Sequence, residues 1–262
     1  MKSHLLLFCF WVSSVTGMCV SSIGCFNNYV LGPLAQSTPT ITPTPTAISG
    51  CNSYSDNFSS NTLGNYDYFL NSSQTVSTAA GCDYTISGGY LLVDPTSNPN
   101  TNNGGLAVVQ STLFGYNYNH YNVIATFEMD NYTQSEGSFG LVFRTGSNGS
   151  DYSFIWDGNA GNGNGGIPDW EFVRNTGSPI VNFYFLGCCV TNPNYVLGST
   201  VTMKVVVTGN NYVCYADTGS GFVQIFNITD STYTSGGMGI LTYGIHQGNK
   251  VQVSNFSVDT CP

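Results

Sequence analysis

Charge is what this sequence has least of. Only 7% of its 262 residues are Asp, Glu, Lys or Arg, against roughly 25% in ordinary globular domains. Five of these are basic, and the formal net charge is −9. Nucleic acids and anionic membrane surfaces are bound through clusters of basic residues, so the composition argues against both partners. Metal cations and neutral polymers remain compatible with it, and Asn, Ser, Thr, Gly and Tyr must supply most of the polar surface.

Long hydrophobic runs are also scarce. The longest follows Lys2 in MKSHLLLFCFWVSSVTG and spans Leu5 to Val12. A short apolar run behind a positive residue and ahead of small residues predicts a secretory signal peptide over residues 1–17, with a signal anchor as the alternative. No second run approaches the length of a membrane span. We therefore expect a secreted or extracellular protein, either free or tethered to the cell surface.

Helical periodicity is missing too, because no window keeps apolar residues at the i, i+3, i+4, i+7 spacing. Apolar and polar residues alternate instead, and clusters of Gly, Asn and Ser separate the alternating runs. This pattern predicts an all-β fold, namely a two-sheet antiparallel β-sandwich or jelly roll. The predicted strands are Gly89–Val93, Leu106–Val109, Val123–Asp130, Ser138–Thr145, Tyr152–Asp157, Trp170–Arg174, Thr200–Val207, Tyr212–Tyr215, Phe222–Asn227, Gly237–Tyr243 and Val251–Val258.

Composition divides the chain into four segments. A short Cys-containing segment, 18–36, follows the predicted signal peptide. Residues 37–49, STPTITPTPTAIS, have nothing to bury and predict a disordered, extended Thr/Pro stalk. The β-sandwich domain is predicted over residues 50–262, without an internal repeat.

The cysteines favour disulfides. Cleavage after Gly17 would leave eight of the nine, and an even number in a secreted chain is typical of a disulfide framework. Their connectivity is open. We predict a Cys51–Cys261 pair, because these two bracket the domain and the terminal strands of sandwiches often lie side by side. Cys25 has a second interpretation as a lipid-modified residue, since SSIGC resembles a lipobox.

Six Asn-x-Ser/Thr sequons predict surface glycans in a host that uses them. They begin at Asn57, Asn71, Asn131, Asn148, Asn227 and Asn255.

Several segments together resemble a secreted concanavalin A-like or laminin-G-like jelly roll. They are SDNFSSNTLGNYDYF, GGYLLV, VIATFEM, FGLVFRTGSNGSDYSFIWDG and the ending from VTMKVVV to NFSVD. The resemblance covers residues 54–259, and it implies sugar binding, adhesion or, in some branches, glycoside cleavage. It also implies a structural calcium ion near the joined termini, for which Asp56 and Asp259 are the candidate ligands because Ca²⁺ prefers oxygen ligands.

Alternation along the strands selects the first candidate ligand residues. Side chains two apart share a face of a sheet, which places Glu128, Arg144 and Asp157 on the side opposite the aromatic residues. Two interpretations stay open: a cross-strand ion pair on a solvated face, or a polar surface that lines a bound glycan.

The segment GNAGNGNGGIPDWEFVRN, residues 158–175, supplies the second set. Gly and Asn permit close backbone approach, which suits a binding loop. An aromatic ring such as Trp170 can pack on a sugar while carboxylates take its hydroxyls. If Trp170 belongs to the core instead, Asp169 and Glu171 point outward and become the contacts.

Catalysis has weaker support. Laminarinase-type relatives of this fold use a Glu-x-Asp-x-x-Glu pattern, whereas Glu128 and Asp130 are followed by Thr133 at the last position. Asp169 and Glu171 form a second acidic pair without a third acid. We therefore predict a non-catalytic module that binds neutral polysaccharide or glycoprotein glycans. A self-assembling structural surface or matrix protein, and a glycoside hydrolase or lyase of this fold, are the alternatives.

Overall fold

The structure is a computed structural model that describes residues 51–70, 76–77, 79–93, 103–129, 137–158, 167–176, 183–245 and 250–260. All of them belong to one compact unit, Thr46–Pro262. These ranges contain strands and two 3-10 turns, η1 (Leu63–Asn65) and η2 (Ala79–Cys82). No helix within them is long and apolar enough to cross a membrane. The predicted signal peptide, Cys-containing segment and stalk lie outside the described residues.

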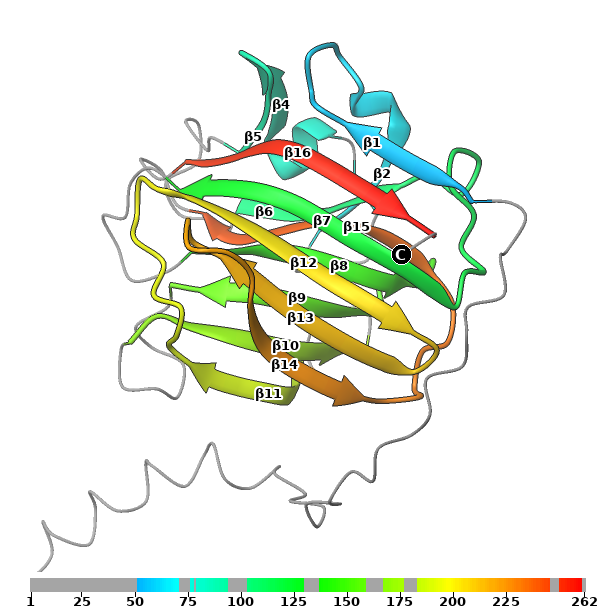
Figure 1. The fold of residues 1–262 in the computed structure, drawn as a ribbon. Helices are drawn as coiled ribbons and strands as arrows, with labels where there is room; N and C mark the ends of the chain where they lie inside the picture. The colour runs from blue at the N-terminus through cyan, green and yellow to red at the C-terminus, as the bar shows by residue number, and fades with distance from the viewer. Residues whose placement is uncertain are drawn as a thin grey trace, which may run out of the picture. The chain divides into compact units, whose positions relative to one another are not determined.

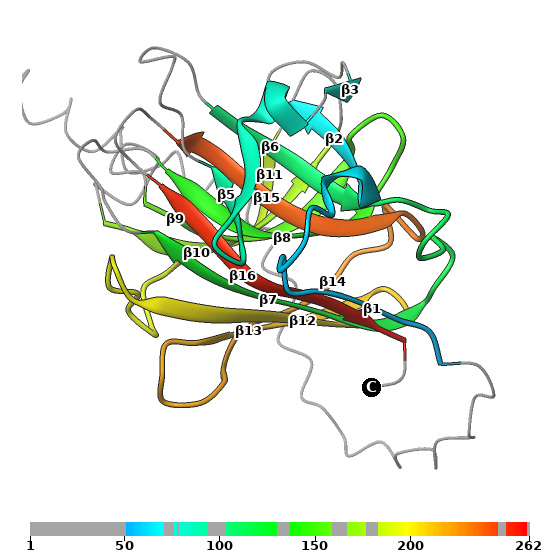
Figure 2. The same ribbon diagram turned by 90° about the horizontal axis from the view of Figure 1, so that it is seen from above.

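The strands form two antiparallel sheets that face each other, so the predicted β-sandwich is confirmed (Figures 1 and 2). Sheet I has the order β14-β13-β12-β7-β16-β5-β4, and β1 pairs with the second half of β16. Its strands are β1 (Ser53–Asp56), β4 (Tyr84–Ser87), β5 (Tyr90–Val93), β7 (His120–Met129), β12 (Thr200–Thr208), β13 (Asn211–Asp217), β14 (Val223–Thr229) and β16 (Val251–Asp259).

Sheet II lies behind sheet I in Figure 1 and has the order β11-β10-β9-β8-β15-β6-β2-β3. Its strands are β2 (Tyr66–Leu70), β3 (Val76–Ser77), β6 (Asn103–Val109), β8 (Ser138–Thr145), β9 (Asp151–Asp157), β10 (Asp169–Asn175), β11 (Phe183–Val190) and β15 (Gly237–Ile245).

The core fills the space between the two sheets. In β7 every second side chain is buried, from Tyr121 to Met129, as a strand with one face in a core requires. Its Phe127 stacks on Phe139 of sheet II with ring centroids 5.0 Å apart, and Phe139 stacks on Trp156 at 5.4 Å. Each such buried ring contributes roughly 1.5–3 kcal/mol of hydrophobic stabilisation. The aromatic half of the alternating pattern therefore holds the sheets together.

Every predicted strand corresponds to a strand of the structure, and β12 and β13 form a tight hairpin. Thr208 pairs with Asn211 across a two-residue turn in which Gly209 has φ 60°. Glycine adopts such positive φ values without steric cost, so this turn sets the register of β12 and β13.

Five strands were not predicted: β1, β2, β3, β4 and β11. The first four are short segments of two to five residues, and such lengths carry little alternation. The β11 sequence FYFLGCCV is a continuous apolar run instead. A run of that kind fits a buried strand or a buried helix equally well, so periodicity alone does not identify it.

The cysteines only partly follow the expected disulfide framework. Cys214 is a buried free thiol, and burial raises the pKa of that thiol. A disulfide framework therefore does not include this position, where Cys214 is one of the small apolar residues of the core. The Cys51–Cys261 pair stays a prediction, since Cys261 lies outside the described residues.

Backbone pairing of the two ends continues up to the predicted disulfide. The Thr260 backbone N–H donates to the Asn52 carbonyl oxygen at 3.0 Å, and the Asn52 backbone N–H donates to Thr260 Oγ1 at 2.9 Å. The terminal strands β1 and β16 thus lie side by side, as the prediction of the pair assumed.

Four of the six sequon asparagines fall within the described residues, and the side chains of all four are exposed. They are Asn57, Asn148, Asn227 and Asn255. Asn71 and Asn131 lie outside the described residues.

Candidate functional site

The outer face of sheet II carries a hollow over β8, β9, β10 and β15. Along β8 and β9 the residues of both faces are buried, whereas β7 of sheet I buries one face only. The outward side chains at the centre of this face form a second apolar cluster, separate from the core between the sheets. This cluster consists of Phe69, Leu106, Val108, Val142, Ile155, Val173 and Leu241.

Acidic groups stand beside that apolar cluster, at one end of β9 and β10. Asp157 lies directly opposite Asp169 in the antiparallel register, and Glu171 follows two residues further along β10, opposite Ile155. Side chains directly opposite have Cβ atoms about 5 Å apart, and diagonal neighbours are about 7–8 Å apart. Three carboxyl groups therefore gather on the outer face, where alternation predicted Asp157 and, in the case of a buried Trp170, also Asp169 and Glu171.

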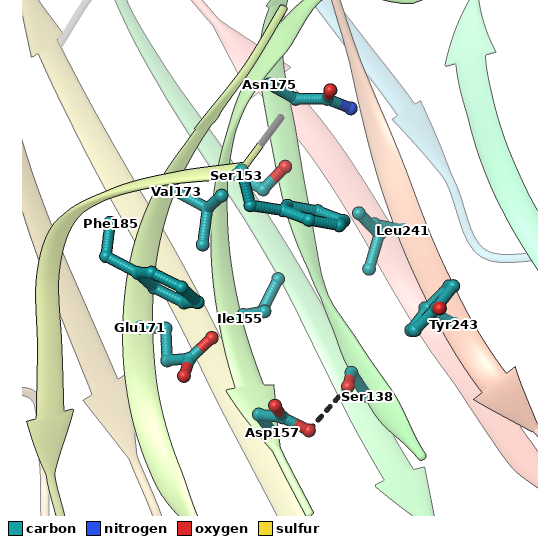
Figure 3. A pocket seen from close by; sticks show the side chains of 11 residues that line it. Ser138, Ser153, Ile155, Asp157, Glu171, Val173, Asn175, Phe185, Leu241 and Tyr243 are labelled. Atoms are coloured by element: carbon teal, nitrogen blue, oxygen red, sulfur yellow. Dashed lines mark hydrogen bonds between the residues drawn. The ribbon is translucent and has the colours of Figure 1, made fainter. Parts of the chain in front are cut away.

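Glu171 has the most strongly raised pKa of the acids in the hollow. Its side chain comes from β10 and points into the hollow toward Asp157 (Figure 3), and the residue is only 4% exposed. Burial, reinforced by the negative charges of Asp157 and Asp169, raises the pKa of Glu171 to about 9. Glu171 is thus a neutral carboxylic acid at neutral pH, able to donate as well as accept a hydrogen bond.

Asp157 is held in place by a neighbour from β8. The Ser138 hydroxyl donates to Asp157 Oδ1 at 2.8 Å, the dashed contact of Figure 3. Because Ser138 and Asp157 are also register partners, the backbone ladder itself brings donor and acceptor together. The carboxyl group is thereby oriented before any ligand arrives.

Aromatic rings border the hollow. Phe183 and Phe185 are on β11, opposite Asn175 and Val173 of β10, and they are 44% and 43% exposed. Tyr243 of β15 lines the hollow from the other flank (Figure 3). Sequence reasoning missed these three residues. The aromatic triplet Phe183-Tyr184-Phe185 was the available signal, but it became meaningful only once β11 was known to pair with β10.

One more buried acid lies next to the hollow, hydrogen-bonded to its lining residues Ser153 and Asn175. Asp151 is fully buried, and it accepts hydrogen bonds from the Ser153 hydroxyl at 2.5 Å and from Asn175 Nδ2 at 3.4 Å. Burial raises the pKa of Asp151 to about 7, although both hydrogen bonds oppose that shift.

The predicted grouping of Glu128, Arg144 and Asp157 is wrong. Glu128 lies on β7 of sheet I and Asp157 on β9 of sheet II, and each points outward from its own sheet. The two therefore lie on opposite outer faces of the sandwich. Strand alternation assigns a side chain to one face of its sheet, but it does not say which of two sheets the strand joins.

Arg144 leaves the outer face altogether. It sits at a β-bulge with φ 57°, because Thr145 and Phe143 pair with the consecutive residues Gly237 and Met238 of β15. A bulge redirects the side chain that alternation would have placed outward. Arg144 is 1% exposed, and its guanidinium donates to the carbonyl oxygens of Tyr118 (2.8 Å), Gly209 (3.1 Å) and Thr234.

The role of Arg144 is consequently structural. The three carbonyls belong to three connecting segments at one end of the sandwich, and the guanidinium also lies 5.4 Å from the centroid of the Tyr121 ring. One buried cation thus ties these segments together instead of contacting a ligand.

Trp170 belongs to the core. It is 1% exposed, its ring packs 5.7 Å from that of Phe154, and its indole Nε1–H donates to the Pro193 carbonyl oxygen at 2.8 Å. The predicted stacking of Trp170 on a sugar is therefore wrong. With Trp170 in the core, Asp169 and Glu171 were expected to face outward, and they do.

The two predicted calcium ligands are not brought together. Ser53 pairs with Asp259 and Asp56 with Phe256, so Asp56 and Asp259 point to opposite faces of sheet I. Asp56 instead accepts hydrogen bonds from the Phe58 N–H (2.8 Å), the Thr62 hydroxyl (2.5 Å) and the Tyr66 hydroxyl (3.0 Å).

Asp56 thereby orders the turn between β1 and β2. The described ranges contain no group of three or more His, Cys, Asp or Glu residues able to hold a metal ion. Asp56 and Asp259 therefore do not fit a shared calcium ion.

The loop predicted for ligand contact, 158–175, is described only at its ends, since residues 159–166 lie outside the described residues.

The described residues of the hollow can bind a polar ligand that also has an apolar side. Carboxyl groups and Ser138 offer hydrogen bonds, and exposed rings offer contact area. The hollow measures about 100 Å³, less than the roughly 300–1,000 Å³ typical of pockets that enclose drug-sized ligands. It therefore suits one edge of a sugar residue in a longer chain.

No protein-family model matches the chain, and no curated protein matches it in sequence. Solved structures are similar to it in fold. One is the CBM2 module of the evolved Dit of Lactobacillus casei BL23 phage J-1, with TM-score 0.55 and 14% identity over 81% of this chain and 97% of that chain. Another is a legume lectin-like domain from Entamoeba histolytica, with TM-score 0.51 and 9% identity over 75% of this chain and 90% of that chain.

Two further similar structures come from larger or liganded proteins. The exoplasmic/lumenal domain of VIP36 in a Ca²⁺/Man3GlcNAc-bound form has TM-score 0.50 and 9% identity over 69% of this chain and 81% of that chain. A xylan beta-1,4-xylosidase from Bacillus halodurans C-125 has TM-score 0.54 and 12% identity over 84% of this chain, but only 41% of that chain. At such identities the likeness shows the fold alone. The sandwich is a concanavalin A-like jelly roll, as the resemblance in sequence predicted.

Proposed function

We propose that the chain is a secreted or surface-displayed carbohydrate-binding module that acts without catalysis. The observation that carries this proposal is the hollow on the outer face of sheet II, where hydrogen-bonding carboxyl groups stand next to exposed aromatic rings. Sugar rings have polar edges and apolar CH faces, so they need both kinds of contact at once. The fold likeness to a CBM2 module and to a legume lectin-like domain supports the same function.

In the proposed complex one sugar residue lies against Phe183 and Phe185 and turns its hydroxyl edge toward β9 and β10. Ser138 orients Asp157 as an acceptor, and neutral Glu171 donates or accepts. The small volume of the hollow limits the deep contact to one residue, so neighbouring residues of a polysaccharide would extend along the sheet. Secretion is supported by the apolar N-terminal segment and by the four exposed sequon asparagines.

Binding of the purified protein to a glycan array, followed by calorimetry with the best oligosaccharide, tests the proposal. Phe185→Ala removes an exposed ring and should weaken binding roughly fivefold, since one aromatic contact contributes about 1 kcal/mol. Tyr215→Ala is the matched control, because Tyr215 packs on Lys204 and Phe222 at sheet I, away from the hollow. Absence of any glycan ligand in the millimolar range, or equal losses in both variants, would reject the proposal.

Glycoside hydrolysis is the second candidate, and the protonated state of Glu171 favours it. A carboxylic acid with a raised pKa beside a second carboxylate is the arrangement by which glycosidases protonate the leaving oxygen and act on the sugar from the other side. Incubation with β-glucans and xylan, followed by measurement of new reducing ends, decides between the two functions. Release of sugar that Glu171→Gln abolishes and Glu128→Gln leaves intact would replace the binding module with an enzyme.

A further inference from the structure

The hollow on sheet II has charge of one sign only. Its eleven lining residues include Asp157 and Glu171 and no Lys, Arg or His. No basic residue of the described ranges lines the hollow, and three of them have contacts in other parts of the fold. Arg144 binds carbonyls at the end of the core, Arg174 forms an ion pair with Asp230 at 2.8 Å, and Lys204 lies 4.7 Å from the ring centroid of Tyr215. The described residues that line the hollow therefore bring negative charge and no positive charge.

Glu171 is the group for which this lack matters most. It is more than nine-tenths buried and aimed into the hollow (Figure 3), yet no described residue donates a hydrogen bond to its carboxyl group. A buried carboxylate without a partner is strongly disfavoured. Holding its proton is how the free protein avoids that cost, in line with its pKa of about 9. A ligand that brought both a positive charge and hydrogen-bond donors would remove the reason for the proton.

An ammonium group has those properties, because it carries a positive charge and three N–H donors and accepts nothing. Hydroxyl groups can hydrogen-bond to Glu171 but bring no charge. A ligand carboxylate or sulfate would place a further negative charge beside Asp157, Asp169 and Glu171, and like charges at that distance repel one another. Charge therefore ranks sugar classes at this site: cationic first, neutral next and anionic last.

We propose that the hollow selects amino sugars, and that Glu171 and Asp157 bind the protonated amine of a glucosamine-type residue whose ring packs against Phe183 and Phe185. This inference rests on the proposed carbohydrate-binding function and names its substrate class. It replaces the neutral polymer that composition suggested. In this proposal the apolar contacts provide affinity for sugars in general, and the acidic residues provide selectivity for amino sugars.

A proton is released when the amine binds. In the free protein Glu171 holds its proton up to about pH 9, whereas the bound cation stabilises the carboxylate and lowers that pKa. Between the two values Glu171 gives up its proton on binding, so affinity for the amino sugar rises with pH until the amine itself deprotonates. The titratable groups that face Glu171 are Asp157 from β9, Asp169 from its own strand and Tyr243 from the far flank on β15.

Calorimetry with four oligosaccharides tests the proposal on the intact chain. The probes are six-residue oligomers of glucosamine, N-acetylglucosamine, glucose and galacturonic acid. The glucosamine oligomer should bind about tenfold or more tightly than the two neutral oligomers, the size expected for a charge-assisted hydrogen bond. The galacturonic acid oligomer should bind most weakly. Equal affinity for glucosamine and glucose oligomers, or preference for galacturonic acid, would overturn the inference.

Glu171→Gln separates charge from shape, because Gln matches Glu in size but cannot ionise. The variant should lose the preference for the glucosamine oligomer and keep its affinity for the glucose oligomer. Glu128→Gln is the matched control on the outer face of sheet I and should retain the preference. If Glu171→Gln retained it as well, the assignment of the amine to Glu171 would be wrong.

Proton release gives a readout that needs no variant. Binding heats of the glucosamine oligomer, measured at pH 7 in two buffers of different ionisation enthalpy, should differ, and those of the glucose oligomer should agree. Equal heats for the glucosamine oligomer would count against the inference. Failure of the proposed function looks different, because none of the four oligomers would then bind; binding of all neutral and cationic oligomers without preference would reject the amino-sugar selection alone.

Discussion

The two outer faces of the sandwich carry the same residue type with different consequences. Glu128 lies on β7 of sheet I between the register partners Thr200 and Gln252, and its side chain is partly exposed. Glu171 lies on β10 of sheet II, almost completely buried beside two further acids. Water can solvate the first carboxylate, whereas the second meets apolar side chains and like charges.

The comparison extends to the surroundings of each glutamate. On sheet I the outward residues of β7 and β12 are partly exposed and mix polar with apolar side chains. Lys204 lies over the rings of Tyr215 and Phe222, 4.7 Å from each centroid. On sheet II the outward residues build a second apolar cluster and leave a hollow. A face becomes a candidate binding site when it has enough apolar material to displace water around a few polar groups.

The largest expected difference in stability is between loss of the buried Arg144 on sheet II and loss of the partly exposed Lys204 on sheet I. Arg144→Met leaves three buried carbonyls without their donor and should lower the free energy of unfolding by about 3–5 kcal/mol. Lys204→Met removes two exposed cation–π contacts and should cost about 1 kcal/mol. Urea unfolding of both variants measures the difference, and equal costs would show that Arg144 is not the tie between the connecting segments.

The second-largest loss of stability is expected from substitution of Gly140, a glycine of β8 beneath the hollow. A Cβ at Gly140 would lie 2.1 Å from the Phe154 carbonyl oxygen, so Gly140→Ala requires the backbone of β9 to shift. The expected cost is about 3 kcal/mol in free energy of unfolding, with weaker glycan binding. Gly64→Ala is the matched control, because nothing lies within 4 Å of its added methyl group. Tolerance of Gly140→Ala at full stability would contradict the tight approach of β8 and β9.

The acids of sheet II make stability depend on pH. The pKa of Asp151 is raised to about 7 and that of Glu171 to about 9. The folded protein thus holds protons that the unfolded chain has released above about pH 4–5. Stability should therefore fall as pH rises above about 4–5, more steeply up to about 7, where both groups contribute, and less steeply from about 7 to 9, where Glu171 contributes alone.

Thermal unfolding between pH 4.5 and 9.5 checks this slope. Asp151→Asn should make the lower part, below about pH 7, less steep, whereas Glu171→Gln should make the lower part less steep and remove the slope of the upper part. Glu128→Gln should change neither part. A midpoint that rises steadily from pH 5 to 9 would contradict the burial of both acids.

The smallest expected difference in stability is between loss of one side-chain hydroxyl on sheet II and loss of one on sheet I. Ser138 donates to Asp157 at 2.8 Å in the hollow, and Thr126 shares a 3.0 Å hydrogen bond with Thr202 on sheet I. Ser138→Ala should cost roughly 1.5 kcal/mol, because its acceptor is a buried carboxyl group, and Thr126→Ala roughly 0.5 kcal/mol. Denaturant unfolding resolves a gap of this size, and the reverse order would indicate that Asp157 does not need the serine.

Much of the site follows from alternation alone. The spacing of Asp169 and Glu171, and the opposite phase of Trp170, predicted that both acids face outward if Trp170 belongs to the core, and the structure decided that condition. Asp157 followed from the same argument. Phe183 and Phe185 did not, since β11 lacks an alternating pattern and a pairing partner is a property of the whole sheet.

Arg144 marks the limit of that reasoning. Its position after Phe143 predicted an outward side chain, and one bulged residue against Gly237 and Met238 reversed it. A bulge depends on the partner strand nearly a hundred residues away in sequence, so no local pattern could reveal it.

By itself, the sequence determined the class of fold, the strands with alternating patterns and the face on which most of their residues lie, because a period of two acts within one strand. Only the tertiary structure decided which outer face closes into a hollow, which glutamate keeps its proton and which arginine turns inward. Those outcomes depend on desolvation and on the charges of residues on other strands. Both are determined by residues that are distant in the sequence and become neighbours only in the folded protein.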